Sequence, residues 1–222
     1  MLLGYADLSL RPSDEDVAIE MIRLARRLGY RILAVEYRDN IDMGKLSNVA
    51  SSMGVKVVGR VTIRGSSRSE VRRALDSIRG IAVGETIVSV EAEALDAARY
   101  AGVNKRVHML RVKPGMESVV DKSQVRLFES RSWGAFEVSL AYVLKPKGWS
   151  YISEVMRRIS KLNVSTRLVV VSDANDIYTM WSPASIIGLL SSLGLSPEHA
   201  ARCISSTPAT IASQAIKTQS RI

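Results

Sequence analysis

The fold is decided by the stretch RLVVVSDAN, which runs from Arg167 to Asn175. Its β-branched run from Arg167 to Ser172 predicts a buried strand, because Val and similar side chains favour the extended backbone. The polar residues Ser172 to Asn175 then predict a corner at the carboxyl end of that strand. We therefore expect the last strand of the chain here, followed by a polar loop.

Three helix starts follow this strand. Ser182-Pro183, Ser196-Pro197 and Thr207-Pro208 each place a hydroxyl at an expected N-cap and a proline at the first helical position. A proline costs nothing there, because its missing N–H would have no partner inside the helix. The sequence therefore predicts that the chain ends in a small helical cap.

The chain before this segment alternates short apolar strands with amphipathic helices. The expected strands are 4–10, 31–36, 55–64, 85–90, 106–112 and 135–140. The expected helices are 13–29, 42–53, 67–79, 91–101, 120–131 and 150–162, with Ser13 as the first N-cap. Such alternation predicts right-handed βαβ units and a parallel sheet of about seven strands, in the α/β class.

One domain, residues 1–222, is expected, because 46% hydrophobic residues without a break in composition predict one core. The sheet is either a closed (β/α) barrel or an open doubly wound sheet. No G-x-G-x-x-G follows the first strand, which favours the barrel. The chain is shorter than the ~250 residues typical of such barrels, so some helices should be trimmed or missing.

The C-terminal motif resembles protein component three of archaeal ribonuclease P and its eukaryal counterpart. The matching residues are Ser172, Ala174, Pro183, Leu193, Gly194, Ala200, Ile204, Ser205 and Pro208. Further matches are Tyr5-Ala6-Asp7-Leu8 at the start, Leu28-Gly29-Tyr30 at the first helix end, and Phe136-Glu137. The motif positions that we single out are Asp7, Ser172, Asp173, Ala174 and Pro183. Trp181 and Ala141-Tyr142 depart from the family pattern.

The resemblance covers nearly the whole chain, and it implies an irregular TIM-type barrel with a C-terminal helical cap. It also implies a protein subunit of ribonuclease P, the ribonucleoprotein endonuclease that removes the 5′ leader of precursor tRNA. In that enzyme the RNA subunit and its Mg²⁺ ions supply the chemistry. The implied partners are the ribonuclease P RNA, precursor tRNA, protein component two and the other protein subunits. The chain itself is then expected to hold no cofactor, no metal and no catalytic residue.

The charge balance agrees with a phosphate-rich partner. There are 31 Lys and Arg against 22 Asp and Glu, a net charge of +9 and a pI near 9.9. The basic residues expected on exposed faces are Arg68, Arg72, Arg73, Lys145, Lys147, Arg157, Arg158 and Lys161. For any one of them taken alone, a solvated helix face is the better explanation. Tyr142, Trp149, Tyr151, Tyr178 and Trp181 are candidates for stacking on bases or for packing.

The alternative function is a free-standing metal-dependent hydrolase on the same barrel. Chemistry in such barrels sits at the carboxyl ends of strands, where we expect Asp7, Arg38, Arg64, Glu91, Glu93, Arg111, Ser139 and Asp173. A zinc-type site needs clustered histidines, and the chain has only His108 and His199, far apart in sequence. Asp7 and Asp173 are therefore predicted to be loop hydrogen-bond acceptors.

Cys203 and the chain start bear on the compartment. A single cysteine excludes an internal disulfide, and Cys203 is expected on the apolar face of a helix. Charges interrupt every apolar run well before the ~20 residues of a membrane span, and the first residues do not resemble a signal peptide. The sequence therefore predicts a cytoplasmic protein without a membrane segment.

Overall fold

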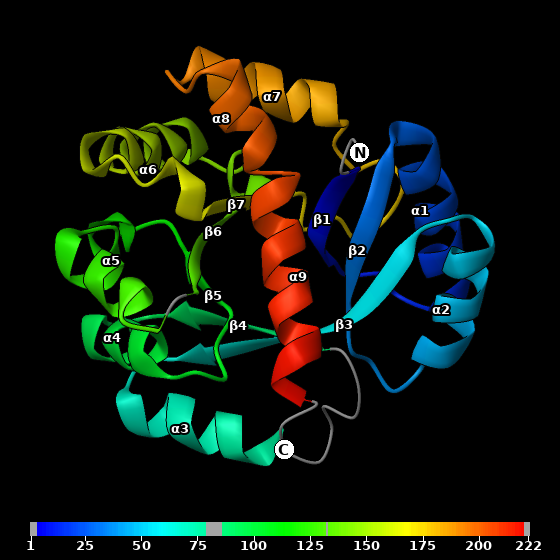
Figure 1. The fold of residues 1–222 in the computed structure, drawn as a ribbon, viewed down its shortest axis with the longest axis horizontal. Helices are drawn as coiled ribbons and strands as arrows, with labels where there is room; N and C mark the ends of the chain where they lie inside the picture. Colours follow the sequence, from blue (N-terminus) through cyan, green and yellow to red (C-terminus); the bar gives the residue numbers. More distant parts are fainter. Residues whose placement is uncertain (1–3, 79–85, 132, 220–222) are drawn as a thin grey trace.

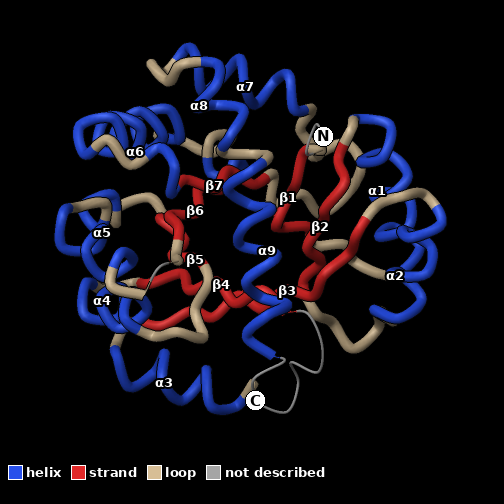
Figure 2. Tube along the Cα trace, viewed as in Figure 1, coloured by secondary structure: helices blue, strands red, loops and turns tan. Residues whose placement is uncertain are grey.

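Seven parallel strands build one sheet in the order in which they follow along the chain. The computed structural model describes residues 4–78, 86–131 and 133–219, and side chains up to residue 215. Within these ranges the strands are β1 (Tyr5–Leu10), β2 (Tyr30–Glu36), β3 (Lys56–Gly65), β4 (Thr86–Ala92), β5 (Met109–Val112), β6 (Ala135–Ser139) and β7 (Leu168–Val171). The sheet curls into a nearly closed ring, as Figure 2 shows.

Helices follow the strands and form an outer ring. Those between strands are α1 (Glu15–Leu28), α2 (Met43–Ser52), α3 (Arg68–Ser77), α4 (Leu95–Val103), α5 (Lys122–Glu129) and α6 (Gly148–Leu162). After β7 come α7 (Pro183–Ser192), α8 (Pro197–Arg202) and α9 (Ser206–Gln219). Short 3-10 helices are η1 (Glu117–Val119), η2 (Leu140–Tyr142) and η3 (Ser165–Arg167). The prediction of an irregular TIM-type barrel with C-terminal helices is confirmed (Figure 1).

Helix α1 begins one residue later than the sequence suggested. Asp14, not Ser13, is the N-cap, because its carboxylate accepts the Val17 N–H at 2.9 Å while the Ser13 hydroxyl donates to Asp14. Gly29 ends the helix with a φ of 92°, a left-handed conformation that a glycine adopts without strain.

Helix α4 was predicted too early in the chain. Residue Glu91 belongs to β4, where it pairs with Arg64 on β3 and Arg111 on β5, and the helix begins at Leu95. Backbone pairing with both neighbouring strands therefore outweighs the local helix propensity at this position. The expected beginning of this strand at Glu85 lies outside the described residues.

The starts of β5 and α5 also differ from the prediction. Strand β5 begins at Met109 rather than Arg106, because the Asn104 side chain accepts the Arg106 N–H in a turn at 2.9 Å. Asp121 caps α5 by accepting the Gln124 N–H at 2.8 Å, so that helix starts later than predicted.

Helix α9 begins at Ser206, so the predicted cap at Thr207 is wrong. Pro208 occupies the third helical position. It is tolerated there because the first backbone bond of the helix runs from the Ala209 N–H to the Ser205 carbonyl. The expected end of α3 at Arg79 lies outside the described residues.

Strands β1 and β7 complete the ring without a continuous ladder. Among the described residues, one isolated bridge joins Leu10 of β1 to Ala174, just after β7, next to a 2.7 Å bond from the Arg11 N–H to the Ala174 carbonyl. We call this junction the seam. A barrel of this type usually has eight strands, so the seam lies where an eighth strand would stand.

The turn between α8 and α9 replaces strand pairing in the lower part of the seam. The Ile204 carbonyl accepts the Ala6 N–H at 2.7 Å, and the Cys203 carbonyl accepts the Val170 N–H at 3.2 Å. Cys203 and Ile204 are both buried. A backbone segment far along the chain thus satisfies polar groups of both the first and the last strand.

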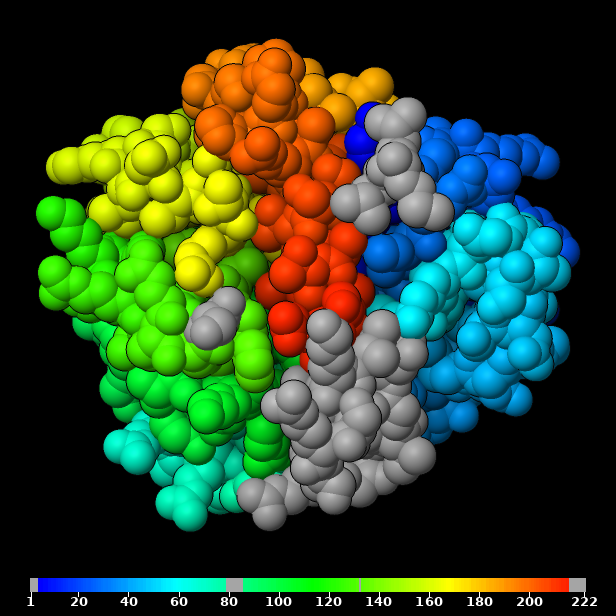
Figure 3. Space-filling model, viewed as in Figure 1, coloured from blue at the N-terminus to red at the C-terminus, as the bar shows by residue number. Residues whose placement is uncertain are grey.

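Helix α9 covers the amino-terminal opening of the barrel. Its apolar side chains Ile211, Ala212 and Ala215 pack against inward-facing residues such as Leu8 and Met109. Figure 2 shows α9 crossing the ring, and Figure 3 shows it filling the middle of this face. Among the residues described, no helix is long and apolar enough to cross a bilayer.

Candidate functional site

The carboxyl half of the barrel interior holds a cluster of charged side chains. We call it the interior ion network, and it consists of Arg11, Arg60, Glu91, Arg111, Glu137 and Asp173. Strand register places them together, since Glu91 pairs with Arg111 and Arg111 pairs with Glu137 on successive strands. Neighbouring positions in a parallel sheet project to the same face, so these charges meet inside the ring.

Glu137 lies between two arginines at the centre of this network. Its carboxylate accepts hydrogen bonds from Arg60 Nη2 at 2.8 and 2.9 Å, from Arg111 Nε at 2.7 Å and from Ser89 Oγ at 2.5 Å. The side chains of Arg60, Arg111 and Glu137 are all fully buried. Burial acts to raise the Glu137 pKa, but the two guanidinium charges outweigh it and hold the pKa below its usual value.

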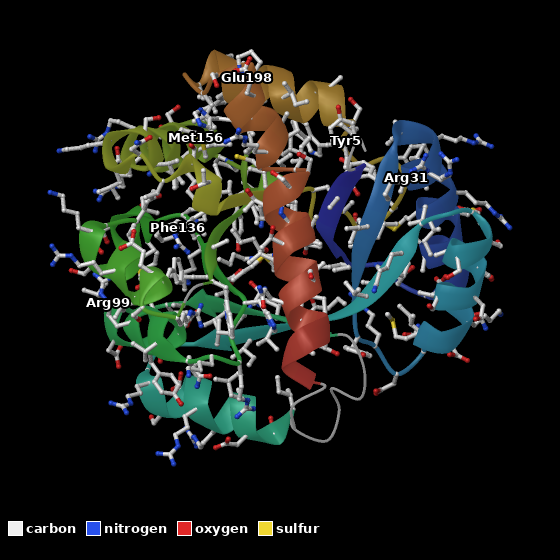
Figure 4. The ribbon with its side chains drawn as sticks, viewed as in Figure 1. Tyr5, Arg31, Arg99, Phe136, Met156 and Glu198 are labelled. Carbon is white, nitrogen blue, oxygen red and sulfur yellow. The ribbon has the colours of Figure 1, made fainter. Side chains whose placement is uncertain are left out.

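Alternate positions of β6 separate this network from the outer core. Phe136, labelled in Figure 4, packs on Phe128 of α5 with ring centroids 5.0 Å apart, whereas the next residue, Glu137, contacts Arg60 across the barrel. The period of two in a strand therefore directs one side chain to the helix layer and the next to the interior.

Asp173 joins the network at the mouth of the barrel. It accepts hydrogen bonds from both Arg111 Nη atoms at 2.9 Å and from Ser9 Oγ at 2.7 Å, and Arg11 Nε lies 2.8 Å away. Although burial acts to raise its pKa, the charge of Arg111 keeps the Asp173 pKa below its usual value. Asp173 has a φ of 57°, a conformation that Asp tolerates better than most residues.

Asp7 has a different environment, in the seam. Its carboxylate accepts the Ser172 N–H at 3.3 Å and the Ser9 N–H at 3.2 Å, and no arginine pairs with it among the described residues. Burial therefore raises the pKa of Asp7 to about 6. Asp7 and Asp173 both accept hydrogen bonds, as predicted, but Asp7 lies in strand β1 rather than in a loop, and only Asp173 belongs to the ion network.

The other residues predicted at the carboxyl ends divide into two groups. Ser139 donates to Asp173 at 3.1 Å, next to Arg111. Arg38 and Arg64 are exposed, with Arg64 3.3 Å from Glu91, and Glu93 pairs with Lys113 instead of the network.

Sequence reasoning missed three members of the central site: Arg60, Glu137 and Ser89. The signal was present, because Arg60 interrupts the apolar run VVGRVTI and Glu137 interrupts AFEVS. A charge inside a strand that is otherwise buried needs a partner of opposite sign. Two such charges on different strands of one sheet therefore predict an internal pair.

Among the residues described, no group of His, Cys, Asp or Glu side chains could hold a metal ion. His108 is buried, accepts the Val88 N–H at 3.0 Å through Nδ1, and has its pKa lowered to about 4 by burial. His199 lies in the first turn of α8, 3.1 Å from the Ser196 hydroxyl. Burial raises the Cys203 pKa to about 12, so its thiol is a poor nucleophile.

The predicted basic residues of α3 lie on its exposed side. Arg68, Arg72 and Arg73 are all exposed, while Val71 and Leu75 of the same helix are buried. The same alternation holds on α6, where Ile152, Val155, Met156 and Ile159 are buried.

The basic side of α6 includes an acidic residue that the sequence reasoning did not consider. Glu154 accepts hydrogen bonds from Arg157 at 2.7 Å and from Arg158 at 2.6 Å, and these bonds lower its pKa to about 2. Lys161 is exposed beside them. One carboxylate therefore offsets part of the charge of this face.

The basic candidates do not form one continuous surface. Figure 1 shows α3 and α6 on well-separated parts of the outer ring, with α4 and α5 between them. Lys145 and Lys147 lie in the loop before α6, and the Lys145 ammonium lies 5.3 Å from the Tyr142 ring centre. Among the aromatic candidates, Tyr151 is buried, and its hydroxyl donates to the Val112 carbonyl.

The predicted motif positions gather around the seam. Ala174 bridges to Leu10, and the Ser172 backbone N–H donates to Asp7. Pro183 is the first residue of α7, after the N-cap Ser182. The departure at Trp181 is tied to the same region, because its carbonyl accepts the Tyr30 hydroxyl at 2.8 Å.

Comparison with known proteins identifies a family that matches nearly the whole chain. The model of the family "RNase P subunit p30" matches residues 4–220. "Ribonuclease P protein component 3" of Aeropyrum pernix is 31% identical over 202 residues, which are 89% of this chain and 92% of the relative.

Two solved structures resemble the fold. The first is a chain of the cryo-EM structure of archaeal ribonuclease P with mature tRNA, with a TM-score of 0.72 and 19% identity, covering 94% of this chain and 90% of that one. The second is an amidohydrolase from Mycoplasma synoviae, with a TM-score of 0.62 and 10% identity over 94% of this chain and 87% of that one. At these low identities the two solved structures show a shared barrel fold. The family match, in contrast, rests on the amino-acid sequence of residues 4–220. The chain belongs to the RNase P subunit p30 family.

Proposed function

We propose that this chain, a protein subunit of ribonuclease P by its family, supports the catalytic RNA of that enzyme and does not carry the chemical step. The observation that carries the proposal is the interior ion network. The carboxyl end of the barrel is where barrel enzymes place their catalytic groups. Here Glu137 and Asp173 are both held as charged partners of buried arginines.

A general base needs a free lone pair and a pKa near the working pH. Glu137 and Asp173 have their pKa values lowered by guanidinium groups, and their oxygens already accept several hydrogen bonds. Asp7 has a raised pKa, but its oxygens accept two backbone N–H groups in the seam. The network is suited to holding the barrel together rather than to moving protons.

In this proposal the chain works in the cytoplasm, with the ribonuclease P RNA and its Mg²⁺ ions performing 5′-leader removal from precursor tRNA. Protein component two and the other protein subunits are its proposed partners. The family match and the likeness to a chain of archaeal ribonuclease P support this assignment. The alternative of a free-standing metal-dependent hydrolase gains no support from the family match.

Contact with RNA is proposed to use the basic sides of the outer helices. Arg68, Arg72 and Arg73 on α3 are exposed, as are Arg157 and Lys161 on α6, with Arg158 half-buried. Exposed guanidinium and ammonium groups bind phosphates without sequence preference and release counterions. Lys145 and Lys147 extend the α6 surface towards the barrel mouth.

The deciding experiment is reconstitution of precursor-tRNA cleavage from the RNA and the other proteins, with and without this chain. We expect the chain to raise the cleavage rate, and a zinc-type metal to be absent from the purified chain. No change in rate on adding the chain, or a stoichiometric transition metal in the chain alone, would contradict the proposal.

A salt titration locates the RNA surface. Changing Arg157, Arg158 and Lys161 together to Gln removes three positive charges, which corresponds to at most about three units in the slope of log affinity against log salt. Because Glu154 already offsets one of these charges, we expect the slope to fall by about two units. The equivalent change of Arg68, Arg72 and Arg73 tests α3. Changing the exposed Arg23 and Arg27 of α1 is the control. If the α3 and α6 variants have the same slope as the α1 control, the basic sides of α3 and α6 face solvent and do not contact RNA.

A further inference from the structure

A pocket opens at the carboxyl-end mouth of the barrel, above the interior ion network. Its volume is about 340 Å³, and its lining includes Arg11, Arg38, Leu144, Lys145, Asp173 and Trp181. Ligand pockets commonly have volumes of ~300–1,000 Å³, so this one is large enough for a small polar group. Most of its lining comes from two loops, residues 140–147 after β6 and 172–182 after β7, and Arg11 and Arg38 come from the connections after β1 and β2.

The charges of this mouth pocket are unbalanced. Asp173 is its one acidic lining residue, and Arg111 and Arg11 already pair with that carboxylate. In the described part of the chain neither Arg38 nor Lys145 contacts a carboxylate. Burial lowers the pKa of Arg11, and the charges of Arg111 and Arg60 act in the same direction while Asp173 and Glu36 oppose them, so three cations lie close together here. A bound anion would relieve that crowding.

Exposed aromatic and apolar side chains lie on the same two loops or next to them. Tyr178 is 90% exposed, Leu144 is 69% exposed and Trp149, at the start of α6, is 59% exposed. Exposed rings together with cations that no carboxylate neutralises are the combination with which proteins hold single-stranded nucleic acid, by stacking on bases and neutralising phosphates. Protein interfaces are also rich in aromatic residues and Arg, so the excess positive charge of the pocket, rather than the rings, is what favours a phosphate as the occupant.

We propose that the mouth pocket binds a backbone phosphate of a single-stranded RNA segment, with Arg38 and Lys145 contacting the phosphate and Trp149 and Tyr178 stacking on the adjacent bases. The proposal rests on the proposed function, because it names the form of RNA that this subunit recognises. Arg11 remains paired with Asp173 and adds positive potential from below. Duplex RNA is excluded from such a site, because its bases are not free to stack on protein rings.

The test uses the full chain and a labelled oligoadenylate of about eight nucleotides, a length within the range bound by single-strand binding folds. Arg38→Gln with Lys145→Gln should lower the salt slope by about 0.7 units, since the two side chains contact one phosphate and each neutralised phosphate on single-stranded RNA contributes about 0.7. Trp149→Ala should weaken binding about five- to 100-fold, whereas Trp149→Phe should keep most of the affinity. All three substituted side chains are exposed, so the fold should survive, which a urea titration checks.

The matched control is the pair Arg23→Gln and Arg27→Gln on α1, which removes the same charge from another surface. Loss in the mouth variants with retention in the control, and weaker binding of a duplex of equal length, would support the proposal. Equal loss in mouth and control variants would overturn it, as would a Trp149→Ala variant that binds the oligonucleotide normally but loses a protein subunit on co-purification. If the wild-type chain supports cleavage while the mouth variants bind RNA normally, only this inference fails. If the wild-type chain does not support cleavage, the proposed function fails.

Discussion

Replacing Glu137 by Gln tests whether the interior ion network is structural. The change keeps the size of the side chain and removes one negative charge from a position with no solvent exposure. Two guanidinium groups, Arg60 and Arg111, contact this carboxylate directly. Both arginines would remain buried, with Glu36 beside Arg60 and with Glu91 and Asp173 beside Arg111.

The expected cost is large because the remaining charges cannot reach water. Removing one partner of a buried ion pair costs about 3–5 kcal/mol, since the other partner stays desolvated and uncompensated. Arg60 keeps Glu36 at 3.2 Å, and Arg111 keeps Asp173 at 2.9 Å, which favours the lower end of that range. For a domain of this size the melting temperature should fall by about 6–20 °C, at ~2–4 °C per kcal/mol.

Urea unfolding followed by circular dichroism measures this cost, with the slope of free energy against urea expected to stay constant. Glu129→Gln, an identical change at an exposed position on α5, should alter the unfolding free energy by no more than about 0.5 kcal/mol. Below its melting temperature, the Glu137→Gln chain should still support cleavage in the reconstituted enzyme. A variant as stable as the wild type, or a stable variant that loses cleavage by orders of magnitude, would refute the structural assignment.

Three further predictions concern Asp7, Asp173 and two glycines. The Asp7 carboxyl has a pKa raised to about 6, so it stabilises the fold below its unfolded pKa and that contribution is lost as pH rises through 6. The loss should total about 3 kcal/mol, about 1 kcal/mol of it between pH 5 and 7, and Asp7→Asn should abolish this pH dependence in urea titrations. Asp7→Ala and Asp173→Ala should change reconstituted cleavage no more than their loss of stability explains; a large rate loss at unchanged melting temperature would make them catalytic. Gly148→Ala should destabilise the chain by about 1–3 kcal/mol, because the new Cβ would lie 2.3 Å from the Val143 carbonyl oxygen. Gly188→Ala, in open space on α7, should instead stabilise it by up to about 1 kcal/mol, and equal thermal shifts for the two would disprove the packing argument.

Local patterns predicted the barrel better than its interior. The β-branched run before Ser172 and the Ser182-Pro183 start are local signals, and the structure confirms a buried β7 and a helix beginning at Pro183. The start of α4 was wrong because Glu91 is held in β4 by partners on β3 and β5, which sequence periodicity does not show.

The candidate site depended on which inward positions meet across the ring. Arg111, Ser139 and Asp173 were predicted at the carboxyl ends, and the structure brings them together. Arg60 and Glu137 were missed because they lie in the strands and are 77 positions apart in sequence. Their pairing depends on ring closure, which is a property of the whole fold.

The seam has a consequence for how the protein is made. Strand β1 is synthesised first, but the carbonyl group that accepts its Ala6 N–H belongs to Ile204, and the Cys203 carbonyl accepts the Val170 N–H of β7. Contacts between such distant parts of a chain form late, and exposed strand edges favour wrong association in the meantime. The growing barrel therefore stays open along one side until Ile204 has emerged from the ribosome, and a shortened chain that ends before Ile204 would leave the Ala6 N–H without this acceptor.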